Sequence, residues 1–161
     1  MIYYTQFKTR LWEIILVGNE LGLSNLHMVT EAGKRNFKIS VNWQRNDSFF
    51  ETIKEQILEY FAGQRKQFDI TLNPQGTDFQ KRVWEQLYAI PFGEIRTYKD
   101  IAIAIGNEKA SRAVGMANSK NPLPLIVPCH RVIGSNGKLT GFAHGLKAKE
   151  QLLKLENNTL R

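Results

Sequence analysis

Residues 97–133 read TYKDIAIAIGNEKASRAVGMANSKNPLPLIVPCHRVI, and this stretch decides how the rest of the chain is interpreted. Cys129, within the closing PCHRV, is the only cysteine of the 161-residue chain, and His130 follows it directly. A thiol reacts as its thiolate, which a neighbouring base or positive charge makes available near neutral pH. A lone cysteine is otherwise most often a small buried hydrophobic residue, and neighbours on a strand point to opposite faces. The pair alone therefore leaves both interpretations open.

The first half of this stretch predicts two short helices joined by a glycine turn, the outline of a helix-turn-helix. Thr97 is expected to cap a helix that Gly106 closes, and Asn107 to cap the next helix over residues 108–117. Three residues of the second helix are spaced so that they share one stripe: Lys109, Arg112 and Met116.

The segment that leads to Cys129 contains three prolines, at positions 122, 124 and 128. They predict an extended, stiff backbone and exclude a helix there. Beyond Cys129, residues 134–137 predict a turn, residues 146–155 an amphipathic helix, and residues 157–161 a disordered tail.

The N-terminal part predicts a small α+β scaffold domain over residues 1–73. Short runs rich in β-branched and aromatic residues predict strands, and apolar residues at helical spacing predict one helix capped by Asp47 or Ser48. The expected strands are residues 2–7, 12–17, 21–28 and 68–72, and the helix ends near Ala62.

The turn Asn73–Gly76 predicts the domain boundary, so the second domain covers residues 74–161. Thr77 and Gln80 predict a capping box for a helix that runs to about Ala89.

The charge of the chain is concentrated in its second part. Net charge is +7; residues 71–161 contain thirteen Lys and Arg against seven Asp and Glu, whereas residues 1–70 contain nine against eight. This asymmetry suits a polyanionic partner, although a solvated basic surface would look the same. No apolar run is long enough to span a membrane, and the single cysteine with no signal peptide predicts a reducing compartment.

The motifs RAVG-x-AN-x-x-NP at residues 112–122 and PCHRV at residues 128–132 resemble the signature of the methylated-DNA–protein-cysteine methyltransferases, also called O6-alkylguanine-DNA alkyltransferases. The resemblance extends from about Phe68 to Glu156 and, more loosely, over the N-terminal part. It implies a ribonuclease-H-like α+β domain followed by a mainly helical domain with a winged-helix-like helix-turn-helix.

The resemblance also implies the reaction. The Cys129 thiolate would take a methyl or other alkyl group from O6 of guanine, with O4 of thymine as a further candidate, in one irreversible turnover. The expected partner is double-stranded DNA that carries O6-alkylguanine. No cofactor, metal, membrane or obligate protein partner is expected, and the compartment would be the cytoplasm, or the nucleus in a eukaryote.

Residue roles follow from the same resemblance. His130 would be the base, Glu156 would orient it, and Asn118 would tie the recognition helix to the active-site segment. From the residues alone, these three could equally be a histidine packed beside a turn, a surface glutamate and a helix C-cap. Residues that match family positions contacting DNA are Arg112, Tyr98, Lys99, Asn107 and Ser135. The alkyl pocket would be lined by Tyr98, Val132, Phe142 and Ala143.

The chain departs from the family pattern at Phe142, which lacks a hydroxyl, and at His144, where a glycine is common. Both departures concern the range of alkyl groups. A zinc site known in some members is not expected, because the only cysteine is already assigned. Two other functions remain as alternatives: a non-catalytic helix-turn-helix protein that binds lesions or regulates, and a thiol hydrolase using Cys129, His130 and Glu156.

Overall fold

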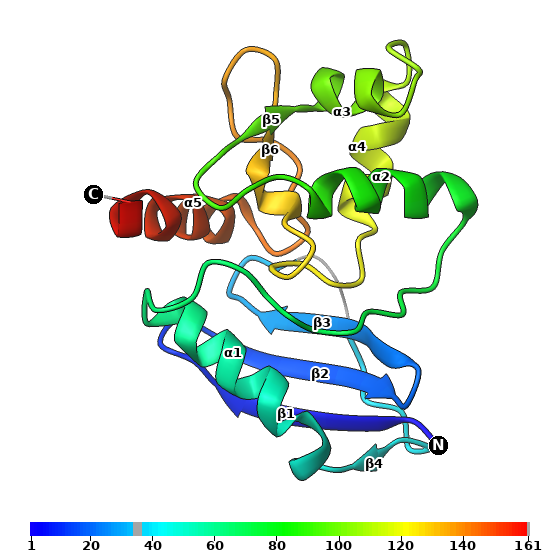
Figure 1. Cartoon of the computed structure of the whole chain (residues 1–161), viewed down its shortest axis with the longest axis vertical. Coiled ribbons are helices and arrows are strands. Elements are labelled where there is room, and N and C mark those ends of the chain that lie inside the picture. The colour runs from blue at the N-terminus through cyan, green and yellow to red at the C-terminus, as the bar shows by residue number, and fades with distance from the viewer. Residues whose placement is uncertain (34–36, 161) are drawn as a thin grey trace.

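The structure is a computed structural model that describes residues 1–33 and 37–160. Figure 1 shows a sheet with one covering helix at the N-terminal end of the molecule and a group of helices stacked on it. The predicted α+β class is therefore confirmed. Buried side chains from both parts form one continuous hydrophobic core.

The N-terminal sheet has the strand order β3-β2-β1-β4. Strands β1 (Tyr3–Lys8), β2 (Glu13–Asn19) and β3 (Gly22–Val29) form an antiparallel meander, and the short β4 (Gln44–Arg45) pairs in parallel with β1. Five consecutive residues of β2 are buried, as its near-continuous apolar sequence requires of a central strand with both faces covered. The first three predicted strands are confirmed.

Helix α1 (Glu51–Phe61) follows a short 3-10 turn, Ser48–Phe50, and lies across the sheet (Figure 1). The prediction that Asp47 or Ser48 caps this helix is wrong: Phe50 is the residue at the N-cap of α1, the Ser48 hydroxyl donates to Asn46 Oδ1 at 3.0 Å, and the carboxylate of Asp47 makes no capping hydrogen bond. The Asp47 carboxylate instead accepts hydrogen bonds from Thr5 Oγ1 at 2.7 Å and from Arg45 Nε at 2.9 Å. The residue that was expected to start the helix thus fastens it to the sheet.

The predicted strand 68–72 is reduced to one isolated bridge, between Leu72 and Leu23. The chain crosses the end of β3 there, and Leu23 N donates to Thr71 O at 2.9 Å. Gly22 permits this crossing: its φ is +138°, and a Cβ at this position would lie 2.9 Å from Thr71 O. The prediction of a full strand at residues 68–72 is therefore wrong, and the segment is a connection that crosses the edge of the sheet.

The C-terminal part is mainly helical. Its elements are α2 (Asp78–Tyr88), β5 (Arg96–Thr97), α3 (Tyr98–Ala104), α4 (Ser111–Ser119), the 3-10 turn η2 (Cys129–Arg131), β6 (Val132–Ile133) and α5 (Leu146–Leu160). Strands β5 and β6 pair in parallel, which brings the start of α3 beside the residues after Cys129. The capping box of Thr77 with Gln80 is confirmed, as is the capping by Thr97.

The prediction that Asn107 caps the second helix is wrong. Gly106 and Asn107 instead close α3: Asn107 N donates to Ala102 O at 2.9 Å, and Gly106 N donates to Ile103 O at 2.9 Å. This pair of bonds, with a φ of +82° at Gly106, is a Schellman motif. Because Gly106 and Asn107 belong to the C-terminal end of α3, α4 begins later than predicted, at Ser111.

Two further expectations need correction. Lys109 precedes α4, so only Arg112 and Met116 share the predicted stripe. The predicted disordered tail is helical as far as Leu160, while Arg161 lies outside the described residues. Among the described residues, no helix is both long and apolar enough to cross a membrane.

Candidate active site and nucleic-acid interface

Cys129 sits at the bottom of a tightly folded loop, with 3% of its surface exposed. Cys129 N donates to Val127 O at 2.7 Å across Pro128, whose φ of −79° and ψ of 68° form an inverse γ-turn. Val127 N in turn donates to Leu123 O at 2.8 Å. The proline segment therefore folds into successive turns, so the prediction of an extended approach to Cys129 is wrong. The segment is held in shape both by its prolines and by these two backbone hydrogen bonds.

Leu125 in the same loop has a φ of +79°, an uncommon conformation for a residue with a branched side chain. Asn121 holds the loop in this shape: its Nδ2 donates to Val127 O at 2.8 Å, and its Oδ1 accepts from Leu123 N at 2.9 Å. Asn121 is 1% exposed. A strained backbone persists only where its surroundings fix it, and this amide is the group that fixes it.

A buried carboxylate lies behind the loop. Glu156 Oε2 is 2.7 Å from His130 Nε2, and Arg131 donates to both oxygens, from Nε at 2.8 Å and from Nη2 at 2.9 Å. Burial alone would raise the pKa of Glu156, but its interactions with His130 and Arg131 outweigh burial and hold that pKa well below its ordinary range. The carboxylate is therefore ionised at every pH at which the protein would work.

The charge of Glu156 fixes the state of His130. Since the ionised carboxylate accepts, Nε2 carries the hydrogen and Nδ1 presents a lone pair, an assignment made from the hydrogen-bond network. No described residue hydrogen-bonds to Nδ1. Burial lowers the pKa of His130; Glu156 opposes this shift, and the charges of Arg131 and Lys149 add to it. At neutral pH the imidazole is neutral and can accept a proton at Nδ1.

Lys149 is a buried cation that sequence analysis missed. Its Nζ donates to Val132 O at 2.5 Å and to Thr140 O at 2.7 Å. Burial lowers the pKa of Lys149 to about 8, while the negative charge of a Cys129 thiolate opposes this shift. The attraction is mutual, so the Lys149 ammonium favours the thiolate form of Cys129.

A signal for this lysine was present in the sequence. Lys149, Leu152 and Glu156 recur at i, i+3 and i+7 along α5, on the face that a helix buries. Two charged residues at core positions of one helix indicate groups retained for a purpose other than packing.

Asn118 lies near the end of α4 and is 2% exposed. Its side-chain amide forms no hydrogen bond with any described residue. The tie predicted for it is made instead by Asn121, whose N donates to Asn118 O at 3.4 Å and whose amide holds the cysteine loop. The alternative interpretation as a helix C-cap is wrong, because Lys120 occupies that position.

The predicted pocket residues are all buried or half-buried. Val132 and Phe142 are buried and Ala143 is half-buried. The Tyr98 hydroxyl donates to Thr140 O at 3.0 Å, and burial raises the pKa of Tyr98, with Thr140 opposing and the Cys129 charge adding. Tyr98 is therefore a neutral hydrogen-bond donor close to the thiol.

His144 packs against two aromatic rings, one in the predicted pocket and one in the N-terminal sheet. It is 1% exposed, and its ring centroid lies 5.5 Å from that of Phe142 and 5.3 Å from that of His27 on β3. Its carbonyl accepts from Thr30 Oγ1 at 2.5 Å. The residue that departs from the family pattern thus connects the pocket loop to the N-terminal sheet.

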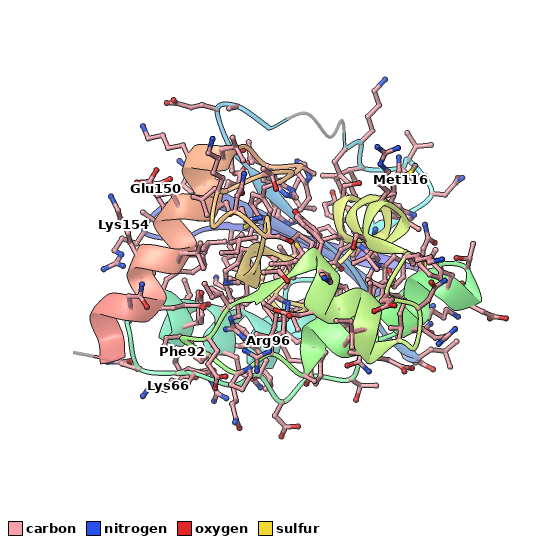
Figure 2. The ribbon with its side chains drawn as sticks, turned by 90° about the horizontal axis from the view of Figure 1, so that it is seen from above. Lys66, Phe92, Arg96, Met116, Glu150 and Lys154 are labelled. Atoms are coloured by element: carbon pink, nitrogen blue, oxygen red, sulfur yellow. The ribbon has the colours of Figure 1, made fainter. Side chains whose placement is uncertain are left out.

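The predicted DNA-contacting residues, apart from half-buried Tyr98, are exposed, as contact with a polyanion requires: Arg112, Lys99, Asn107 and Ser135. They belong to α3, α4, the junction between these helices and the turn after β6, which lie at the end of the molecule remote from the N-terminal sheet (Figure 1). Figure 2 looks onto this end and shows Met116, 67% exposed, on the outer side of α4. In the part of the chain that the structure describes, no group of three or more His, Cys, Asp or Glu could hold a metal ion.

Comparison with known proteins agrees with this geometry. Two family profiles match: 6-O-methylguanine DNA methyltransferase, ribonuclease-like domain, over residues 2–74, and 6-O-methylguanine DNA methyltransferase, DNA binding domain, over residues 78–158. The methylated-DNA–protein-cysteine methyltransferase of Methanosarcina barkeri is 51% identical over 99% of this chain and 100% of its own length. The crystal structure of Mycobacterium tuberculosis O6-methylguanine methyltransferase, 42% identical, superposes with a TM-score of 0.89 and covers 99% of this chain and 94% of its own. The structure of Mycobacterium tuberculosis OGT in complex with DNA, 41% identical, has a TM-score of 0.88 and covers 98% and 94%.

Proposed function

The chain belongs to the family of methylated-DNA–protein-cysteine methyltransferases, and from this premise we propose that it repairs duplex DNA by moving a methyl or larger alkyl group from O6 of guanine to Cys129. O4 of thymine is a second candidate substrate atom. The observation that carries the proposal is that Cys129 is followed by His130, a neutral base held by the ionised Glu156, and that the thiolate charge of Cys129 interacts with the buried ammonium of Lys149.

The reaction is one displacement. His130 Nδ1 takes the thiol proton through a bridging water molecule and becomes an imidazolium, which the ionised Glu156 stabilises. The thiolate sulfur forms a bond to the alkyl carbon, the bond from that carbon to O6 breaks, and the electron pair passes to guanine, which regains a proton. Nothing removes the alkyl group from the resulting thioether, so each molecule acts once.

Tyr98 has a role in recognising the guanine. Its hydroxyl now donates to Thr140 O and would transfer this hydrogen bond to the guanine ring when the base enters the pocket. Val132, Phe142 and Ala143 would surround the alkyl group. Because Phe142 is buried against His144, the pocket wall on this side is fixed by contact with the N-terminal sheet.

The target base must leave the duplex, since its reacting atom is inaccessible inside the stack. Arg112 is exposed on α4 and would fill the vacated space, for which a planar guanidinium is suited. Lys99, Asn107 and Ser135 would contact the DNA backbone around it. Such contacts carry no sequence information and make binding sensitive to salt.

We also propose that the functional division falls at residues 73 and 74, and that Asn121 couples α4 to the active-site loop, with Asn118 taking part through the carbonyl that accepts from Asn121 N. The protein would work in the compartment that holds the genome, the cytoplasm or, in a eukaryote, the nucleus.

The number of reaction events per molecule tests this proposal. With excess duplex containing radiolabelled O6-methylguanine, label transferred to protein should stop at one methyl group per active molecule. A non-catalytic lesion binder would transfer none, and a thiol hydrolase would release product without limit and keep no label. Either result would reject the proposed reaction.

A further inference from the structure

The active-site carboxylate receives a hydrogen bond from the other half of the chain. Tyr60, on α1 of the N-terminal part, donates its hydroxyl to Glu156 Oε2 at 2.6 Å. The two residues are 96 positions apart in the sequence. The same oxygen lies 2.7 Å from His130 Nε2, so Tyr60 and the base share one acceptor atom.

The position of this hydroxyl is fixed by the packing of its ring. Tyr60 is fully buried, and its ring centroid lies 5.3 Å from Phe61, 5.5 Å from Phe68 and 6.1 Å from Phe92. Phe92 belongs to the C-terminal part and is itself flanked by two cations. Arg131 Cζ lies 5.7 Å from its centroid and Lys66 Nζ 5.8 Å, the latter pair visible in Figure 2.

The protonation state of Tyr60 suits a permanent donor. Burial raises the pKa of Tyr60 well above its ordinary value, and the charge of Glu156 raises it further. The phenol therefore keeps its proton throughout the working pH range and can only donate to the carboxylate. A donor fixed in this way constrains the plane of the Glu156 carboxylate and competes with His130 for its charge.

A second hydrogen bond joins the N-terminal part to the loop that carries the nucleophile. Leu26 N, on the edge strand β3, donates to Pro122 O at 2.8 Å, at the start of the loop that carries Cys129. The same N-terminal part is thus in contact with the cysteine loop at one point and, at another, with the carboxylate that pairs with His130.

From these contacts we propose that Tyr60 is a positioning residue for the alkyl transfer. The N-terminal domain would contribute to the active site through this hydroxyl, which orients Glu156 and thereby the His130 imidazole. The inference rests on the proposed function, and it assigns to the first domain a part in the reaction in addition to support.

The experiment compares Tyr60→Phe with the wild-type protein in single-turnover alkyl transfer from an O6-methylguanine duplex over a range of pH. The variant loses one oxygen and keeps the ring packing. A positioned acid or base contributes about 10²–10⁴-fold to a rate, and we expect loss of one positioning contact to slow transfer about tenfold. Without the competing phenol, Glu156 holds the imidazolium more strongly, so the acidic limb of the rate profile should move to higher pH.

Phe50→Leu is the matched control. Phe50 is fully buried just before α1, ten positions before Tyr60, and its hydrocarbon side chain has no group that could donate a hydrogen bond to the carboxylate. This variant therefore weakens the same domain without removing a hydrogen bond to Glu156. In both variants the reaction amplitude gives the fraction of folded protein, and the rate constant of that fraction measures how well the active site performs the transfer. The Nε2–H proton resonance of His130 provides a second measurement and should shift in Tyr60→Phe alone.

The outcomes separate the inference from the function. If wild-type protein transfers the alkyl group, but Tyr60→Phe matches Phe50→Leu in rate constant, pH profile and resonance, the positioning role is refuted and the function stands. If wild-type protein transfers nothing, the proposed function itself fails.

Discussion

Replacing Glu156 by Gln removes one charge from the buried network and leaves its shape almost unchanged. An amide cannot accept at both ends, so the donors from His130, Tyr60 and Arg131 can no longer all be satisfied. The guanidinium of Arg131, 6% exposed, would also lose its counter-charge.

The effect on stability follows from this loss. Removal of one partner of a buried ion pair costs about 3–5 kcal/mol. For a chain of this size 1 kcal/mol shifts Tm by about 2–4 °C, so Tm at pH 7 should fall by about 6–20 °C. The pKa of Glu156 is lowered on folding, so its stabilisation is present above the unfolded pKa and is lost as pH falls toward the folded one. The difference between wild-type and variant Tm should therefore shrink in acid.

The effect on reaction should be larger. Without the carboxylate the tautomer of His130 is no longer fixed and its imidazolium is not stabilised, so we expect the single-turnover rate constant to fall by about 10²–10⁴-fold. The assay is rapid-quench transfer from an O6-methylguanine duplex, with thermal unfolding followed by circular dichroism.

Glu150→Gln is the matched control on the same helix. Glu150 is exposed and pairs at i, i+4 with Lys154, with 3.1 Å between Oε1 and Nζ, and Figure 2 shows both on the outer side of α5. Exposed helical pairs contribute about 0.3–0.5 kcal/mol, so Tm should hardly change and the rate should not. If Glu156→Gln behaved like this control in both assays, the network described here would have no part in stability or reaction.

Three further predictions concern separate parts of the site. Lys149→Met should slow transfer at pH 7 about tenfold with unchanged DNA affinity, because the thiolate loses one cationic neighbour. The difference in rate from wild type should diminish as pH rises through about 8, where the native ammonium loses its proton. A difference that is independent of pH would contradict the electrostatic role. Lys99→Ala should weaken binding to undamaged duplex and reduce the slope of log affinity against log salt by about 1, and an unchanged slope would exclude a phosphate contact. Asn121→Ala should reduce the free energy of unfolding by about 1–3 kcal/mol, because it leaves Leu123 N without an acceptor in the interior and leaves Val127 O with Cys129 N as its donor. A loss below about 0.5 kcal/mol in denaturant unfolding would contradict this.

Local signals in the sequence predicted local structure well. The capping box at Thr77 and the cap at Thr97 formed as expected, because a cap depends on residues three positions apart. Asn107 shows the limit of such reasoning: the same residue fits the start of one helix and the end of another, and the Schellman bonds of α3 decided between them.

Contacts between distant residues were beyond pattern analysis. The pairing of His130 with Glu156 was expected only through family resemblance, because nothing in their spacing brings them together. Tyr60 lies within the helix that apolar spacing predicted, but no periodicity reveals that its hydroxyl meets a carboxylate 96 positions away. The strand predicted at residues 68–72 had the right composition, but the docking of both parts of the chain made it a crossing connection.

The most direct test of the central claim is intact-protein mass spectrometry after incubation with a duplex that contains one O6-methylguanine. We predict one mass increase of about one methylene group, located on Cys129 by peptide mapping and absent in Cys129→Ser, as expected for a thiolate acting as the accepting nucleophile. DNA binding without a change in mass, or an increase that persists in Cys129→Ser, would contradict the assignment of this thiol as the acceptor.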